Sequence, residues 1–537
     1  MKKGLLIVLL FFSCLNALAQ EDAWVYLLDK KDVTASIANP ISILSQKAIN
    51  RKALHNIPID ERDVPVDEDY IAQLKSSTGI TVKAKSKWFN AVHVRGSIVN
   101  IQALDDLSFV SHIEFADKDL NTSKTSKEKL NSKFESVFTD FNYGNAFNQI
   151  DMLNGHILHQ ENYTGAGMTV AVLDAGFPNV NIMSAFERLR STNNLLGSYD
   201  FVNREEDVYT NNTSNHGTLV LSTMAGFIQD QFVGTAPDAG YFLFITEDAT
   251  SETPVEESYW VEAAERADSL GVDVINTSLG YTTYDNPNYS YSPSDMNGNT
   301  AYITKGANIA FEKGMLLVTS AGNSGNDSWQ IVGAPADASG VLSIGAVNAN
   351  GAYAFFSSKG SAAQPNQKPD VVAQGLASYV ITENNTTATS NGTSFSSPIM
   401  AGAVTCLWQA LPDKNNEEIM QLVREYASQY ENPDNFLGYG IPDFEKALNA
   451  GLGFGNVPED TEELIVFPSP TTGKLYISGF IDSSGLAKLY LFDIWGKKIS
   501  EFDLNRETDD NIDLSFLSSG LYILNTGENK TFKIVKQ

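Results

Sequence analysis

Short apolar runs alternate with helical patterns from about Phe141 to Leu452, which is more than half of the chain. Representative runs lie at residues 168–173, 272–275, 315–318 and 341–346. Apolar runs of this length, separated by helices, are typical of parallel strands that are buried on both faces. The pattern predicts an α/β fold in which helices cover both faces of a parallel sheet. Functional side chains are then expected at the carboxyl ends of the strands.

Smaller units flank this stretch on both sides. Residues 21–118 mix strand-like and helical patterns, and their last part alternates strand, helix and strand, which is half of a ferredoxin-like α+β sandwich. Residues 119–140 include the polar stretch NTSKTSKEKLNSKFE, which predicts an exposed and cleavable linker. After a second linker at 453–463, the alternating runs of residues 464–537 predict a small β-sandwich.

The first twenty residues carry the pattern of a secretory signal peptide. Lys2 and Lys3 precede the apolar run LLIVLLFF, and Ala17-Leu18-Ala19 supplies small residues before a cleavage site. The run is short for a membrane span. A retained anchor and a lipoprotein signal are the alternatives. Residues 1–20 are therefore predicted to direct export.

Charge and cysteine content exclude several classes of protein. The chain has 37 basic and 65 acidic residues, a net charge of −28, and a surface this negative argues against nucleic-acid binding. Of the two cysteines, Cys14 lies in the predicted leader and only Cys406 remains after its removal. The mature chain can therefore form no internal disulfide or cysteine-based zinc site, and its stability must come from buried area.

Two polar residues stand at the borders of predicted elements. Asp174 ends the apolar run at 168–173, and small residues follow it. His216 follows Asn215, a predicted N-cap, and opens a predicted helix. Taken alone, each has an ordinary structural interpretation, as a turn cap and as a surface or capping histidine.

A third polar residue, Ser394, lies in the segment NGTSFSSP, before a predicted helix at residues 399–410. Pro398 is predicted in the first turn of that helix, where its missing N–H is harmless. Ser394 is thereby expected at a helix N-terminus, where free backbone N–H groups favour a nearby oxyanion. A capping serine is the alternative.

Together the three residues predict nucleophilic catalysis. A serine hydroxyl needs an adjacent base, imidazole is a suitable one near neutral pH, and a buried carboxylate fixes its tautomer. Asp174, His216 and Ser394 occur in the chain order found in subtilisin. A buried run that ends in Ala321-Gly322-Asn323 adds an amide that could stabilise an oxyanion together with the Ser394 backbone N–H.

On these motifs, residues 141–452 resemble the subtilisin-like serine peptidases. Further matching stretches are GTAPDA (234–239), NTSLG (276–280), SIGAV (343–347), FSSKG (356–360), KPDVV (368–372) and GYG (438–440). The resemblance implies that Asp174, His216 and Ser394 form a catalytic triad and that Asn323 is the oxyanion donor.

The same resemblance implies a substrate-binding edge. Ser278, Leu279 and Gly280 would pair with the substrate backbone, and Ala321 and Gly322 would line the primary specificity pocket.

The chain departs from the usual pattern of these peptidases at three places. Ala175 stands where Ser or Thr is usual, Leu219 replaces a frequent second histidine, and FSS at 395–397 replaces Met-Ala-Ala. None of these changes removes a group that the mechanism requires, so activity remains the prediction.

The flanking units resemble control elements of secreted peptidases. Residues 21–118 resemble the inhibitory propeptide of subtilases, which implies an intramolecular inhibitor and self-cleavage between about Lys118 and Asn142. A permanent accessory domain is the alternative. Residues 464–537, with FPSPTTG at 467–473, resemble the C-terminal sorting domain of the type IX secretion system. That resemblance implies export through the outer membrane of a diderm bacterium by the type IX machinery. An adhesive or carbohydrate-binding module is the alternative.

The resulting prediction is a secreted serine endopeptidase that cleaves protein or peptide substrates through an acyl-enzyme. A degenerate adhesive protein on the same scaffold is the alternative. An α/β-hydrolase esterase is disfavoured because GTSFS at 392–396 lacks the second glycine of a nucleophile elbow.

No cofactor is required by this prediction. The acidic loops at 203–207 and 252–257 offer oxygens that suit calcium, but without EF-hand spacing, and no calcium site is assigned. Residues 281–300, rich in Tyr, Asn, Ser and Pro, either shape the groove or form a surface loop.

Overall fold

The computed structural model divides into two compact units, Met1–Leu452 and Gly453–Gln537. It describes residues 20–120, 141–210, 213–452 and 465–536, the last range with gaps at 468, 470, 472, 479–485, 494–495, 506–510 and 527–530. The predicted signal peptide (except Gln20), nearly all of the predicted linker at 119–140 and the linker at 453–463 lie outside the described residues, and the segment bounds stay predictions. Within the described ranges, no helix has the length and apolar character that a membrane crossing requires.

A sheet of parallel strands forms the centre of the first unit. Its order is β13-β12-β11-β10-β5-β9-β6, and every neighbouring pair is parallel. The prediction of a parallel α/β sheet is confirmed. The strands are β5 (Thr169–Asp174), β6 (Leu195–Asp200), β9 (Gly240–Ile245), β10 (Val274–Thr277), β11 (Leu316–Ser320), β12 (Val341–Val347) and β13 (Val371–Gln374).

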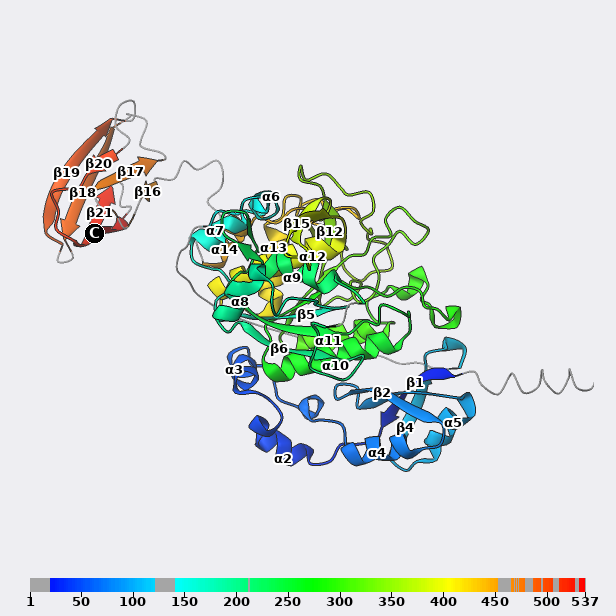
Figure 1. The fold of residues 1–537 in the computed structure, drawn as a ribbon. Coiled ribbons are helices and arrows are strands. Elements are labelled where there is room, and N and C mark those ends of the chain that lie inside the picture. Colours follow the sequence, from blue (N-terminus) through cyan, green and yellow to red (C-terminus); the bar gives the residue numbers. More distant parts are fainter. Residues whose placement is uncertain are drawn as a thin grey trace, which may run out of the picture. The chain divides into compact units, whose positions relative to one another are not determined.

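Each face of this sheet has its own hydrophobic core, because side chains alternate along a strand. Val170 and Val172 of β5 belong to the core formed with helices α9 (His216–Ala225) and α12 (Thr393–Ala410). Ala171 and Leu173 belong to the opposite core, formed with α10 (Val255–Leu270) and α11 (Tyr302–Glu312). In Figure 1, α10 and α11 lie between the sheet and the blue N-terminal segment. Helices therefore cover both faces, as predicted.

The N-terminal segment forms an antiparallel sheet of order β2-β3-β1-β4. Its strands are β1 (Glu21–Leu27), β2 (Ile80–Ser86), β3 (Ala91–Gly96) and β4 (Val110–Phe115), and its crossover helices are α4 (Glu68–Ser76) and α5 (Ile98–Gln102). This is the ferredoxin-like arrangement that was predicted. Its first crossover is long, because α2 (Val33–Ala38) and α3 (Gln46–Leu54) precede α4.

The second unit is a β-sandwich, as predicted. One sheet contains β16 (Ile465–Phe467), β17 (Lys474–Ser478) and β20 (Asn511–Asp513), and the other contains β18 (Leu486–Asp493), β19 (Lys498–Asn505), β21 (Gly520–Thr526) and β22 (Thr531–Lys536). Leu475 and Ile512 of the first sheet share a core with Leu489, Leu491 and Leu524 of the second. Inward-facing residues of both sheets thus form its core.

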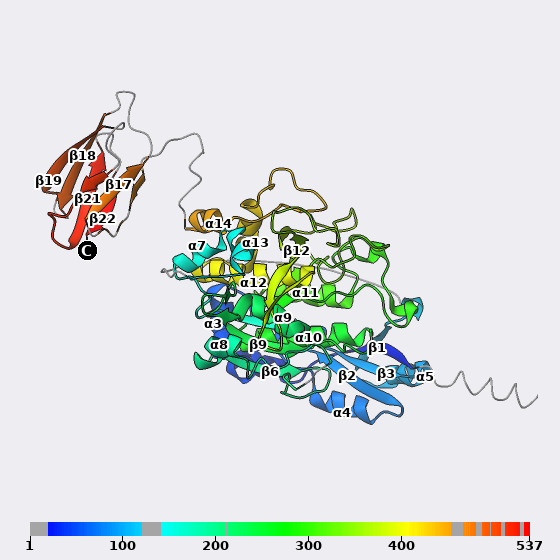
Figure 2. The ribbon, with the colours of Figure 1, turned by 45° about the horizontal axis from the view of Figure 1, so that its top comes forward.

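Shorter elements complete the first unit. In Figure 2, α12 runs beside α13 and α14, with α7 close by. The remaining helices and strands are α6 (Phe147–Asp151), α7 (Gly155–Gln160), α8 (Glu187–Ser191), α13 (Asn416–Glu425), α14 (Phe444–Gly451), β7 (Phe227–Ile228), β8 (Phe232–Val233), β14 (Ser378–Ile381) and β15 (Thr387–Ser390). The 3₁₀ helices are η1 (Pro40–Ser42), η2 (Glu61–Asp63), η3 (Ala103–Asp106), η4 (Lys118–Leu120), η5 (Ser184–Phe186), η6 (Pro287–Tyr289) and η7 (Pro293–Asp295).

The predicted start of α12 was wrong. The helix begins at Thr393, so Pro398 lies inside it rather than in its first turn. Proline lacks the N–H that would bond to the carbonyl four residues earlier, which belongs to Ser394. Ser278 Oγ donates a hydrogen bond to that carbonyl at 2.9 Å, so the carbonyl that Pro398 leaves without a helical partner is satisfied.

Candidate active site

Asp174 and His216 meet at the carboxyl end of the sheet. Asp174 is the last residue of β5 and is fully buried, and His216 is the first residue of α9. The Nδ1 atom of His216 donates a hydrogen bond to Asp174 Oδ1 at 2.8 Å. Burial lowers the pKa of His216, but the charge and hydrogen bond of Asp174 outweigh this effect, and the pKa is raised above its ordinary 6.5. The pair therefore holds an imidazole whose Nε2 can act as a base.

Asn215 is the N-cap of α9 and the helix begins at His216, as predicted. Asn215 occupies the N-cap position but makes no capping hydrogen bond with its side chain. Its Nδ2 instead donates to Glu383 Oε2 at 2.7 Å, and the backbone N–H of His216 donates to Ser214 Oγ at 3.2 Å. The Asn215 side chain thus bonds to a neighbouring loop rather than to the first turn of the helix.

Ser394 lies in the first turn of α12, at the helix N-terminus where the sequence predicts it. Its hydroxyl donates to the carbonyl of Ser278 at 3.3 Å. Both Ser394 and His216 lie in the described residues, and no hydrogen bond joins them there. The ring of Phe395, the next residue, lies 6.0 Å from the His216 ring, centroid to centroid. The structure thus brings Asp174 and His216 into direct contact and places Ser394 on the segment beside them.

Asn323 lies beyond the end of β11 and is oriented by Thr393. Its Oδ1 accepts hydrogen bonds from the backbone N–H of Thr393 at 2.8 Å and from Thr393 Oγ1 at 3.1 Å. The amide Nδ2 consequently points toward the segment before Ser394, where a Cβ added to Gly392 would lie 3.6 Å from it. Asn323 is exposed, so its Nδ2 can reach a ligand.

The predicted substrate edge continues β10. Ser278 is buried, Leu279 is half-buried and Gly280 is exposed, so the segment reaches the surface at its far end. Ala321 and Gly322 follow the neighbouring strand β11, and the N–H of Gly322 donates to Thr393 Oγ1 at 3.1 Å. Both segments therefore lie beside the start of α12, at the same end of the sheet as Asp174.

A cavity opens next to the N-terminus of α9. Its volume is about 480 Å³, and Asn179, Ser214 and Glu383 are among its lining residues. Ser214 and Asn215, which line the cavity, immediately precede His216 in the chain, but His216 itself does not line it.

One residue near the site, Glu247, was not predicted from the sequence. Glu247, just beyond the end of β9, has an electrostatic interaction with His216. Its Oε2 accepts a hydrogen bond at 2.7 Å from the hydroxyl of Tyr281, which directly follows the predicted substrate edge. The sequence did contain a signal for it. Glu247 follows the apolar run GYFLFI at 240–245, and functional side chains are expected just beyond the carboxyl ends of such strands.

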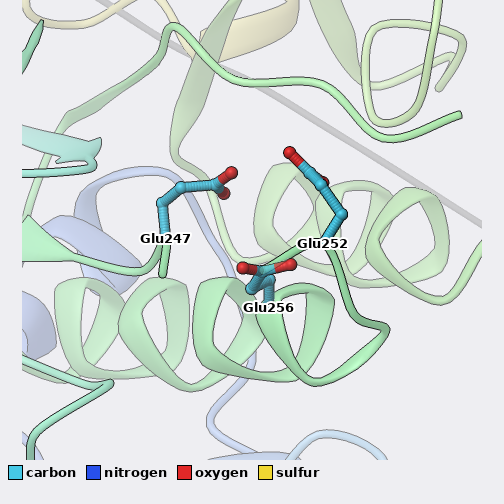
Figure 3. A group of neighbouring side chains, drawn as sticks. All are labelled: Glu247, Glu252 and Glu256. Carbon is cyan, nitrogen blue, oxygen red and sulfur yellow. The ribbon is translucent and has the colours of Figure 1, made fainter. Parts of the chain in front are cut away.

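Glu247 also belongs to a group of three glutamates. Figure 3 shows Glu247, Glu252 and Glu256 pointing toward one another, and one carboxylate oxygen of each lies within 4.8 Å of the others. Burial raises the pKa of Glu247 to about 8 and that of Glu256 to about 9. Protonated carboxyl groups are poor ligands for a divalent cation. Among the described residues, the acidic loop at 203–207 contributes to no such group, and no calcium site is assigned.

Comparison with known families identifies all three parts of the chain. The profile of the "Peptidase S8 propeptide domain, Bacteroidota" matches residues 22–133, that of the "Subtilase family" matches residues 165–440, and that of the "Secretion system C-terminal sorting domain" matches residues 465–537. The sorting domain indicates export, to the cell surface or into the medium.

Individual relatives agree with the family match. Subtilisin E of Bacillus subtilis (strain 168) is 30% identical over 300 residues, which is 56% of this chain and 70% of that protein. Subtilisin of Bacillus pumilus is 30% identical over 300 residues and is covered to 97% of its length. Subtilisin Savinase of Lederbergia lenta is 30% identical over 293 residues and is covered to 93%. The chain therefore belongs to the subtilase family and is a subtilisin-like serine peptidase that carries its own propeptide domain and a secretion-sorting domain.

Proposed function

We propose that the enzyme is an endopeptidase in which Asp174, His216 and Ser394 form the catalytic triad. The observation that carries this proposal is the 2.8 Å hydrogen bond from His216 Nδ1 to the buried Asp174, at the end of the sheet where Ser394 begins α12. That bond leaves Nε2 of His216 unprotonated in the neutral ring, ready to accept a proton.

Catalysis begins with a rotation of the Ser394 side chain. Its hydroxyl leaves the carbonyl of Ser278, a 3.3 Å contact that is long for an O–H donor, and turns toward His216. Catalytic hydrogen bonds are often loose without substrate and tighten when it binds. His216 then takes the proton as Ser394 Oγ attacks the scissile carbonyl, and it returns the proton to the leaving amine. Water then attacks the acyl-enzyme. His216 takes a proton from this water and returns it to Ser394 Oγ as the acyl product leaves.

Asn323 Nδ2 and the backbone N–H of Ser394 stabilise the oxyanion in this proposal. The two contacts from Thr393 hold Asn323 in one orientation before substrate arrives. The N–H of Ser394 lies in the first turn of α12, where backbone donors have no partner within the helix. Donors fixed in advance need no reorganisation in the transition state.

The substrate backbone pairs with Ser278, Leu279 and Gly280 as an added strand. Ala321 and Gly322 form the wall of the pocket for the residue before the cleaved bond. A Cβ on Gly322, whose φ is +107°, would lie 2.8 Å from Ser358 Oγ, so this wall is lined by backbone.

The flanking domains control when and where this activity appears. The propeptide inhibits the enzyme in the uncleaved chain, and self-cleavage between about residues 118 and 142 starts its activation. The type IX machinery exports the protein, which is then released or attached at the surface.

Self-processing of the full chain tests the proposal. The parent chain should cleave itself between residues 118 and 142, whereas the Ser394→Ala chain should stay intact until a trace of active parent is added. The same cleavage in a highly purified Ser394→Ala chain would contradict the assignment. Absence of cleavage and of peptide hydrolysis in both chains would favour the adhesive alternative.

A further inference from the structure

Residues 281–300, which we call the tyrosine-rich segment, directly follow the proposed substrate edge and are built onto the peptidase domain. The backbone N–H of Tyr281 donates to the carbonyl of Ala334 at 2.8 Å, and that of Tyr291 donates to the carbonyl of Thr282 at 2.8 Å. Three of the four tyrosines of the segment are buried. The segment is therefore packed against the domain next to the substrate edge.

A buried carboxylate fixes the middle of this segment. Glu257 of α10 accepts hydrogen bonds at Oε1 from the hydroxyls of Tyr284 at 2.5 Å and of Tyr291 at 2.7 Å. Its Oε2 accepts a third hydrogen bond from the backbone N–H of Ile303 at 2.8 Å. The ring of Tyr291 is thereby oriented by groups that all belong to the peptidase domain.

Lys118 of the propeptide domain places its ammonium group against this segment. Its Nζ lies 3.0 Å from Asp295 Oδ2 and 4.2 Å from the centroid of the Tyr291 ring, and it donates to the carbonyl of Ser290 at 3.3 Å. A carboxylate, an aromatic face and a carbonyl oxygen each attract a cation. We call Ser290, Tyr291 and Asp295 the cation clamp.

The carboxylate of the clamp is held in place without the propeptide domain. Asp295 Oδ2 accepts hydrogen bonds from the backbone N–H of Ser292 at 2.8 Å and from the Ser292 hydroxyl at 2.9 Å. Burial opposes the ionisation of Asp295, but the hydrogen bonds from Ser292 and Lys118 outweigh it and lower the pKa below its ordinary 3.8. Asp295 therefore carries a negative charge at neutral pH, in an orientation that its own domain sets.

Lys118 stands where the propeptide domain leads into the linker. Strand β4 ends at Phe115, and the self-cleavage proposed above falls after Lys118. The preceding residue, Asp117, accepts a hydrogen bond at 3.1 Å from Nδ2 of Asn288, which also belongs to the tyrosine-rich segment. The chain that contacts the segment thus lies upstream of the bond to be cut, as part of a substrate does.

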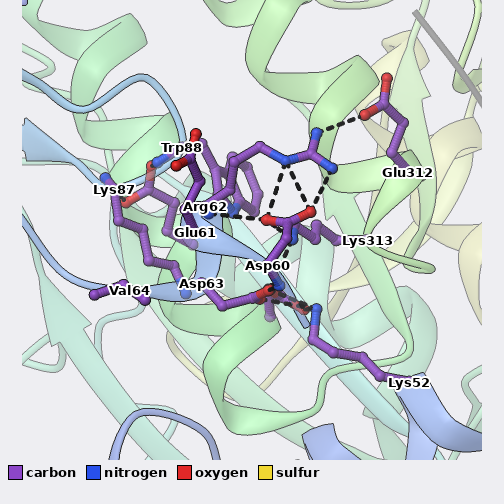
Figure 4. A network of polar contacts seen from close by, with 12 residues as sticks. Lys52, Asp60, Glu61, Arg62, Asp63, Val64, Lys87, Trp88, Glu312 and Lys313 are labelled. Carbon is purple, nitrogen blue, oxygen red and sulfur yellow. Dashed lines mark hydrogen bonds and ion pairs between the residues drawn. The ribbon is translucent and has the colours of Figure 1, made fainter. Parts of the chain in front are cut away.

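A second group of contacts between the two domains lies at the opposite end of the central sheet. Figure 4 shows Lys313 meeting the carboxylates of Asp60 and Asp63, at 2.9 and 2.8 Å. Lys313 shortly precedes β11, and Asp268 shortly precedes β10, so both are at the amino ends of parallel strands, whereas Asp174 is at a carboxyl end. Those contacts are remote from the substrate edge, and the cation clamp adjoins it.

We infer that the cation clamp is a subsite of the peptidase, which binds a lysine or arginine side chain upstream of the cleaved bond in protein substrates. This inference deepens the proposed function and rests on it. Lys118 fills the clamp in the uncleaved chain, and a basic residue of the substrate takes its place in the processed enzyme. The net charge of −28 favours the approach of basic chains in the same sense.

Cleavage of matched peptides tests the inference. An external protease with a recognition sequence placed within residues 121–135 frees each enzyme of its propeptide and is then removed. One peptide has the sequence of residues 114–144, and a second differs only by Lys118→Gln. Mass spectrometry measures kcat/KM at the same bond of both. The parent should show a kcat/KM at least about fivefold higher for the lysine peptide, because it alone offers an ion pair and a cation–π contact.

Two variants of Asp295 separate recognition from general damage. Asp295→Asn keeps an oxygen for Ser292 but loses the charge, and the ratio of the two kcat/KM values should fall to within about twofold of one. Asp295→Lys should reverse the preference, so that a third peptide with Lys118→Glu is cleaved with a higher kcat/KM than the lysine peptide. Poor folding of a variant cannot produce such a reversal.

Asp285→Asn is the matched control. Asp285 is an exposed residue of the same segment, and its carboxylate accepts a hydrogen bond from the backbone N–H of Glu252. This variant should keep the parent's ratio to within about twofold.

Equal kcat/KM for the lysine and glutamine peptides in the parent would overturn the inference while the proposed function stands. A preference for lysine that persists in Asp295→Asn would overturn it as well, because another group would then bind the lysine. Cleavage of neither peptide by the parent would contradict the proposed endopeptidase itself, and the subsite with it.

Discussion

Polar groups at the two ends of the central sheet differ in how exposed they are and in how completely they are paired. At the carboxyl end, His216 is partly exposed, Asn323 is exposed, and the Ser394 hydroxyl has one long hydrogen bond. At the amino end, Asp268 and Lys313 are buried and each contacts two opposite charges. Polar groups at the carboxyl end therefore remain available to hydrogen-bond a substrate, whereas the charged groups at the amino end are paired with the propeptide domain.

This difference separates catalysis from retention of the inhibitor. Groups that must bind a transition state cannot be fully paired beforehand, because only interactions strengthened in the transition state speed the reaction. Groups that hold an inhibitor in place gain from complete pairing, since a buried charge without a partner is costly. Changes at one end should therefore alter turnover, and changes at the other should alter stability and release.

The largest effect is expected at the carboxyl end. His216→Ala should lower kcat by about 10⁶, because Ser394 loses its base, as in related triads where one member is removed. His156→Ala, a partly buried histidine away from the site, is the matched control and should keep activity. Peptide hydrolysis measures both, after an external protease has removed the propeptide from each variant. A loss below about a hundredfold for His216→Ala would contradict its role as base.

A large effect of a different kind is expected at the amino end. Lys313→Met should destabilise the uncleaved unit by about 1–3 kcal/mol, because the buried Asp63 and the half-buried Asp60 each lose one of two cations, while Lys52 and Arg62 remain. Urea unfolding in the Ser394→Ala background measures this free energy. In the active background, kcat of the processed enzyme should not change. A large fall in kcat with an unchanged free energy of unfolding would contradict the claim that the amino end affects stability and not turnover.

A smaller effect on turnover is expected from the oxyanion donor. Asn323→Ala should lower kcat by about 10²–10³ with little change in KM. Thr393→Val should lower it by roughly fivefold, since it removes one of two hydrogen bonds that orient Asn323 and costs about 1 kcal/mol. Steady-state kinetics on one peptide resolve the two. An equal loss in both variants would mean that Thr393 acts otherwise than through Asn323.

The smallest effects concern pH. The base must be unprotonated, and Asp174 raises the pKa of His216, so kcat/KM should rise with pH through a midpoint above 6.5. Ionisation of Glu247, whose pKa burial raises to about 8, adds a negative charge beside His216 and should give a further small inflection there. Glu247→Gln should lose the inflection near pH 8 and keep the acid limb. An inflection that persists in this variant would belong to another group.

The sheet and the candidate triad could be predicted from sequence because their signals are local. Apolar runs mark the strands, and Asp174, His216 and Ser394 each stand in a short motif at the border of an element. Contacts between residues that are far apart in the sequence could not be predicted in the same way. The Ser394 carbonyl in α12 accepts a hydrogen bond from Ser278, 116 residues away, and Arg51 of the propeptide domain bonds to Asp268, 217 residues away. No periodicity or spacing records such contacts.

Covalent labelling of the nucleophile tests the central claim most directly. A fluorophosphonate reacts with a serine only where a base and an oxyanion site activate it. Mass spectrometry of the labelled enzyme, after an external protease has removed the propeptide from every variant, should find the probe on Ser394. Labelling should be lost in Ser394→Ala and retained in Ser396→Ala, two residues along the same helix. Equal labelling of the parent and Ser394→Ala, or a probe attached to another residue, would contradict the account.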